Sequence, residues 1–100
     1  RDSITSISLA SETALDYDKF EEWFGTLLRT RGQNILRSKG ILDFQGMNKR
    51  YVFQGVHMLM DGAPIGDWPE GGQRTSKIVF IGRDLESMRL QEGFDACKVA

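Results

Sequence analysis

The stretch that decides the fold is ILRSKGILDFQGMNKRYVFQGVHMLM, residues 35–60. Two runs rich in Ile, Leu, Val, Phe and Tyr flank a short polar segment that holds Gly46 and Asn48. β-Favouring residues on both sides of turn-forming residues are typical of a β-hairpin. This stretch is also the longest apolar part of the chain, and it contains the only histidine, His57. The sequence therefore predicts a central pair of hairpin-connected strands.

Side chains in a strand alternate between its two faces. In the first predicted strand, one face carries Leu36, Ser38, Gly40, Leu42 and Phe44, and the other carries Ile35, Arg37, Lys39, Ile41 and Asp43. Gly40 weakens a strand, so we expect a large aromatic side chain of a packed helix to approach closely there. In the second strand neither face is clearly polar. We therefore expect both faces to be covered, one by helices and the other by something outside this chain.

A helix is predicted before the hairpin. Its apolar positions, all on one stripe, are Phe20, Trp23, Phe24, Leu27 and Leu28. Asp16 is the expected N-cap, because its carboxylate can accept free backbone N–H groups of the first turn. Gly32 is expected to end the helix in the left-handed conformation.

The remaining segments complete one domain over residues 1–100. Residues 3–11 alternate as a half-buried strand, and residues 77–82 (KIVFIG) form another. Residues 61–75 hold both prolines and four glycines and are expected to form a loop, with Trp68 more as a plug over the core than as an exposed contact. A last helix is expected after the N-cap candidate Asp84, with Leu85 packing on its first turn. Its stripe is Leu90, Phe94 and Cys97.

The predicted order is β-α-β-β-β-α, an α+β two-layer sandwich with a largely antiparallel four-stranded sheet and helices on one face. If the first helix is a right-handed crossover, the first two strands run parallel with another strand between them. This arrangement is ferredoxin-like in outline.

Composition narrows the function classes. Thirteen Lys and Arg against fourteen Asp and Glu give a formal net charge of −1, so nucleic acid is not a favoured partner. No apolar run approaches the ~20 residues that span a bilayer, and no signal peptide is visible. The single Cys97 excludes an internal disulfide and favours a reducing, cytoplasmic location.

The sequence contains neither G-x-x-x-x-G-K-[ST] nor Cys-x-x-Cys, so no phosphate cradle or metal cage is predicted, and no catalytic residue is assigned. His57 has two open interpretations. The favoured one is a histidine at a strand end that contacts its surroundings or a neighbouring domain. The other is a metal ligand, for which Cys97 and Asp61 are weak helpers, because one histidine cannot hold zinc alone.

Several segments together resemble one known family. They are RSKGIL around Gly40, FQGVH at residues 53–57, WP at residues 68–69 and FIGRDL at residues 80–85. This sequence is similar to the C-terminal domain of CobW-type P-loop GTPases, which are associated with metal delivery and cobalamin synthesis. The resemblance runs from about Ile4 to Cys97. It implies an accessory domain that follows a GTPase domain carrying the phosphate-binding loop and a cysteine-rich metal motif.

The resemblance implies a non-catalytic, protein-binding domain without cofactors of its own, whose parent uses GTP with Mg²⁺ and zinc or cobalt. The implied partners are the N-terminal GTPase domain and a metal-receiving client protein. The predicted contact residues are Gln54, His57, Trp68 and Arg83. The alternative function is a stand-alone, dimeric ferredoxin-like protein or enzyme that binds a small molecule and uses His57 as a general base or ligand.

Overall fold

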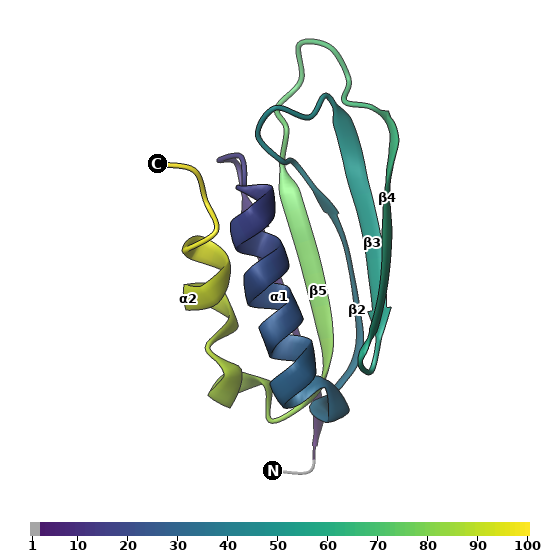
Figure 1. Ribbon diagram of the computed structural model, residues 1–100, viewed down its shortest axis with the longest axis vertical. Coiled ribbons are helices and arrows are strands. Elements are labelled where there is room, and N and C mark those ends of the chain that lie inside the picture. The colour runs from purple at the N-terminus through teal and green to yellow at the C-terminus, as the bar shows by residue number, and fades with distance from the viewer. Residues whose placement is uncertain (1–2) are drawn as a thin grey trace.

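The computed structural model describes residues 3–100. Its elements in chain order are β1 (Ile4–Ser11), α1 (Tyr17–Arg31), the 3₁₀ helix η1 (Gly32–Asn34), β2 (Ile35–Leu42), β3 (Lys49–Val56), β4 (Leu59–Asp67), β5 (Ser76–Arg83), the 3₁₀ helix η2 (Leu85–Met88) and α2 (Leu90–Asp95). Figure 1 shows two layers, with both α-helices on the same side of one sheet. The predicted α+β sandwich is therefore confirmed.

Within the described residues the sheet has five strands, not the predicted four, in the order β1-β5-β2-β3-β4, and every neighbouring pair is antiparallel. Because β5 lies antiparallel between β1 and β2, these two strands run parallel to each other, as the predicted crossover through α1 requires. The predicted β2–β3 hairpin is confirmed, and residues 43–48 connect its strands.

The prediction of a loop over residues 61–75 is wrong in its first half, because β4 (Leu59–Asp67) pairs along β3. The partners Val56 and Leu59 enclose a two-residue turn, in which His57 has a φ of 55°. Tight hairpin turns need such positive φ values, usually supplied by Gly or Asn, so this turn carries no ordinary sequence signal. Pro64 also concealed the strand, yet proline is tolerated where a strand lies at the edge of a sheet.

Helix α1 begins as predicted, since the backbone N–H of Lys19 donates to Asp16 Oδ1 at 2.9 Å. It does not end as predicted. Gly32 has a φ of −60° and continues into the 3₁₀ helix instead of adopting the left-handed conformation. The glycine is needed for space, because a Cβ there would lie 2.6 Å from Cγ of Met58 in the β3–β4 turn.

The C-terminal segment also differs from the prediction. Asp84 is left-handed, with a φ of 57°, and caps no helix through its side chain. Its Oδ2 atom instead accepts hydrogen bonds from Ser87 Oγ at 2.9 Å and from Arg31 Nη2 at 3.3 Å, which joins η2 to the end of α1. The α-helix proper starts only at Leu90, yet the predicted stripe of Leu90, Phe94 and Cys97 is buried.

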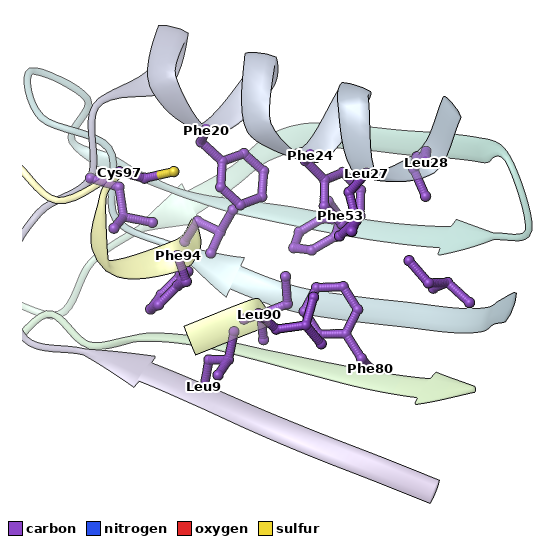
Figure 2. Close-up of a cluster of buried hydrophobic side chains, with 14 of the residues drawn as sticks. Leu9, Phe20, Phe24, Leu27, Leu28, Phe53, Phe80, Leu90, Phe94 and Cys97 are labelled. Atoms are coloured by element: carbon purple, nitrogen blue, oxygen red, sulfur yellow. The ribbon is translucent and has the colours of Figure 1, made fainter. Parts of the chain in front are cut away.

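The core lies between the helices and one face of the sheet, as Figure 2 shows. Phe20 and Phe24 of α1 stack with ring centroids 5.4 Å apart, and each also meets Phe53 edge-on. Such edge contacts add to the stabilisation from area burial. The fully buried members of the core include Leu15, Ile35, Leu42, Phe44, Ile78, Phe80, Leu85 and Phe94.

Two details of the predicted β2 faces change. A register shift between Ile35 and Arg37 turns Ile35 into the core, although simple alternation put it on the opposite face. Gly40 does accommodate an aromatic ring, but the ring belongs to the neighbouring strand. A Cβ at Gly40 would lie 2.9 Å from Cε1 of Phe53 and 2.5 Å from the carbonyl oxygen of Lys77.

Candidate functional site

The candidate site is the sheet face that is turned away from α1 and α2, here named the outer face. Cross-strand partners of an antiparallel sheet point to the same side, so the pairing register assigns its members. They are Ile4, Ser6, Ser8 and Ala10 of β1, Lys77, Val79, Ile81 and Arg83 of β5, Arg37, Lys39 and Ile41 of β2, Val52, Gln54 and Val56 of β3, and Leu59, Asp61 and Ala63 of β4.

A groove of about 610 Å³ crosses the outer face from β5 to β4. Its exposed or half-buried apolar side chains are Ile41, Val52, Ala63, Ile65 and Val79, and its polar ones are Lys39, Gln54, Asp61 and Lys77. The core residue Phe53 also borders the groove but is only 2% exposed. Beyond the groove, the aliphatic side chains continue towards the β3–β4 turn, where Leu59 is 78% exposed and Val56 is 48% exposed.

Exposed aliphatic side chains that lie next to one another on a sheet are typical of surfaces that bind protein. The charges on this face are unbalanced. The cations that the register assigns to it are Arg37, Lys39, Lys77 and Arg83, and the one carboxylate so assigned is Asp61. The face is therefore cationic although the whole chain has a net charge of −1.

The structure places the four predicted contact residues at separate positions on the sheet. Gln54 lines the groove on the outer face. Arg83 also belongs to the outer face, at the end of β5 where it pairs with Ile4. His57 is exposed in the β3–β4 turn at this same end, because its neighbour Val56 pairs with Arg37 near the start of β2.

Trp68 lies at the opposite end, directly after β4, where its backbone N–H donates to the carbonyl oxygen of Asn48 at 3.3 Å. Its side chain is half-buried, and its indole Nε1 is buried without a hydrogen-bond partner among the described residues. The partly buried apolar side chains that pack on the core are Ile7, Trp23, Met47 and Tyr51. Trp68 is not one of them, so it is not the plug over the core that the sequence suggested.

The weak metal candidates His57 and Cys97 are not brought together. The carbonyl oxygen of Cys97 accepts from the backbone N–H of Asp16, close to the β2 end opposite His57. Cys97 is 1% exposed, and burial raises the pKa of its thiol to about 11. Figure 2 shows this side chain among the buried apolar residues. Within residues 3–100, no three His, Cys, Asp or Glu side chains form a group that could hold a metal ion.

The family motifs pointed to Gln54 and Arg83, which the structure places on the outer face, but not to Lys39, Lys77 or the aliphatic residues between them. A signal was present. In RSKGIL and in SKIVFIGR, cationic and aliphatic residues share the positions that alternate with core positions. That pattern becomes a surface only once β2 and β5 are known to be neighbours, which the sequence does not specify.

Comparison with known proteins gives curated relatives and solved structures, of which three follow. The zinc chaperone YjiA of Escherichia coli (strain K12) is 30% identical over 97 residues, which are 94% of this chain and 29% of the relative. The crystal structure of the Zn(II)-bound YjiA GTPase from E. coli superposes with a TM-score of 0.88 at 27% identity, covering 96% of this chain and 30% of that one. A Zn(II)-bound triple mutant of the YjiA GTPase gives a TM-score of 0.89 with the same identity and coverage.

The chain thus spans less than a third of the length of the proteins that it matches. No helix in the described part of the chain is long and apolar enough to cross a membrane. Residues 4–98 match the family of the cobalamin synthesis protein cobW C-terminal domain, and the length of this match, together with the shared fold, means that the chain belongs to that family.

Proposed function

We propose that this chain is the non-catalytic, protein-binding accessory domain of a cytoplasmic GTPase that delivers a metal ion, zinc or cobalt, or serves cobalamin synthesis. The family match over residues 4–98 supports the accessory role, and the resemblance to a zinc chaperone supports the metal. In this proposal GTP, Mg²⁺ and the delivered metal bind to the remainder of the parent chain. The accessory domain contacts that remainder and a metal-receiving client protein.

The observation that carries the proposal is the outer face, with its 610 Å³ groove and its exposed aliphatic side chains. Monomeric domains of this size rarely expose such a surface, because its burial against a partner is favourable. The domain can fold without that partner, because its core is complete between the helices and the inner face of the sheet.

The test compares the full-length parent, the same protein without this domain, and the domain alone. We expect GTP hydrolysis in the first two proteins, and we expect zinc transfer to an apo-acceptor protein to be slower when the domain is removed. GTP hydrolysis by the purified domain alone would contradict the non-catalytic role. Unchanged zinc transfer after its removal would contradict the role in metal delivery.

A further inference from the structure

We propose that the outer face docks, through its groove, on an acidic and aliphatic surface of the nucleotide-binding part of the same parent chain. This proposal rests on the proposed function, because that function provides the remainder of the chain. It adds the surface that is used, the chemistry of the surface that it meets, and the residues that select it.

The first step is the arrangement of side chains in the groove. Two neighbouring rows cross the strands. One row is Lys77, Ile41, Val52 and Ala63, and the next is Val79, Lys39, Gln54 and Asp61. Each row therefore holds one lysine next to an aliphatic side chain, Lys77 beside Ile41 in the first row and Lys39 beside Val79 in the second. A complementary surface needs aliphatic groups over the floor of the groove and carboxylates over its lysines.

The second step is the state of the cations. Within residues 3–100, no carboxylate lies within ion-pair distance of Arg37, Lys39 or Lys77, and all three are exposed. Elsewhere in the domain, the exposed Lys49 and Arg89 and the half-buried Lys98 each have a carboxylate partner at 2.7–3.1 Å. Unpaired charges on an apolar surface select an oppositely charged partner and speed its approach, and their attraction strengthens when docking excludes water.

The third step is the choice between protein and nucleic acid, both of which could neutralise cations. Sheet faces that bind single-stranded RNA stack its bases on aromatic side chains. The outer face carries no Phe, Tyr or Trp at any position assigned by the strand register. Its apolar residues are Ile, Leu, Val and Ala, which pack against aliphatic protein side chains. The composition of the face therefore favours an acidic protein surface.

The last step is the choice of the same chain. In the structural relatives, this domain accounts for 30% of the polypeptide, so most of each relative lies outside the matching domain. A covalently tethered surface has an effective concentration of the order of millimolar, at which weak contacts suffice. A shallow groove with a few charges fits such an arrangement better than tight binding of a free partner.

The experiment is zero-length cross-linking of the full-length parent with a carbodiimide, which joins a lysine amine only to a touching carboxylate, followed by mass spectrometry. We expect intramolecular cross-links from Lys39 and Lys77 to carboxylates outside residues 1–100, lost at high salt. The variant Lys39→Glu/Lys77→Glu should bind the separately produced GTPase part on the order of tenfold more weakly. The control, Lys19→Glu/Arg29→Glu, changes the net charge equally on α1 and should bind normally.

Circular dichroism of the isolated domain checks that both variants fold. Cross-links only from lysines outside the outer face, or equal weakening by both variants, would overturn the proposal. Tight binding of a fluorescent single-stranded RNA at physiological salt, lost in Lys39→Glu/Lys77→Glu, would overturn it in favour of nucleic acid. A parent that hydrolyses GTP and transfers zinc but lacks these cross-links contradicts only the docking surface. A parent without GTP hydrolysis contradicts the proposed function.

Discussion

Replacing Gly93 with alanine should destabilise the domain, although helix propensity alone predicts the opposite. Gly93 lies inside α2, where alanine is ordinarily more stable than glycine by about 1 kcal/mol. In the structure, however, α2 packs on the indole of Trp23 in α1. A Cβ at Gly93 would overlap Trp23 Nε1 and lie 2.6 Å from Cε2 and 2.8 Å from Cδ1, shorter than any van der Waals contact.

The cost follows from how firmly Trp23 is held. Its ring centroid lies 5.8 Å from that of Phe20 and 6.4 Å from those of Phe80 and Phe94, so the indole cannot retreat without disturbing the core. Overpacking of this kind costs about 1–3 kcal/mol, and we expect the upper part of that range because the added atom is fixed to the backbone. After the gain in propensity, the net loss is about 1–2 kcal/mol, which lowers Tm by roughly 4–16 °C.

The assay is thermal and urea unfolding of the purified domain followed by circular dichroism. Gly25→Ala in α1 is the matched control, because its new Cβ would meet only the flexible end of Arg29 at 3.3 Å. It should stabilise the domain by up to about 1 kcal/mol. In a Trp23→Leu background the penalty for Gly93→Ala should largely disappear. If Gly93→Ala raises Tm as Gly25→Ala does, the docking of α2 on Trp23 is wrong.

Three further predictions follow from single groups. Burial raises the pKa of Asp43, more than the nearby Arg74 lowers it, so the contribution of Asp43 to stability is present below the ordinary Asp pKa and is lost as pH rises through the folded-state pKa. Asp43→Asn should therefore gain in urea stability over the wild type between pH 4 and pH 7, and a relative loss would mean that the attraction to Arg74 dominates. Because burial raises the pKa of Cys97 to about 11, iodoacetamide at neutral pH should modify the folded thiol on the order of 100-fold more slowly than the unfolded one, and equal rates would contradict its burial. Asp16→Ala removes the N-cap bond to Lys19 and should cost about 1 kcal/mol of unfolding free energy, whereas an unchanged urea midpoint would mean that this bond contributes nothing.

Residue patterns were sufficient for most of the fold, and they failed where tertiary contacts decide the local conformation. The stripe of α1 and its Asp16 cap are local features, and both are confirmed. The sequence does not predict the edge strand β4, because its turn at His57 and Met58 lacks glycine and because Pro64 ordinarily argues against a strand. Its strand conformation comes from pairing with β3, which overrides weak intrinsic propensity.

Tertiary contacts also decide the role of Gly32 and the composition of the outer face. Gly32 was interpreted through its conformational freedom, whereas its role is to make room for Met58, a residue distant in sequence. Gln54 and Arg83 were selected from family motifs, and they do lie on the outer face. The cationic and aliphatic mixture around them depends on strand order, because neighbouring strands contribute alternate residues to one surface. No single segment of the sequence shows that mixture.

Two features of the structure oppose aggregation, although the outer face exposes aliphatic side chains. Lys39 and Lys77 each lie beside an aliphatic side chain of the outer face, and like charges on this face repel a second copy of the same surface. The edge of the sheet at β4 is protected differently, because Pro64 lacks an N–H to offer to another strand. Both features oppose self-association, and in the proposed docking the lysines also favour an acidic partner. A surface protected in this way favours docking on the face of the sheet over strand addition at the β4 edge.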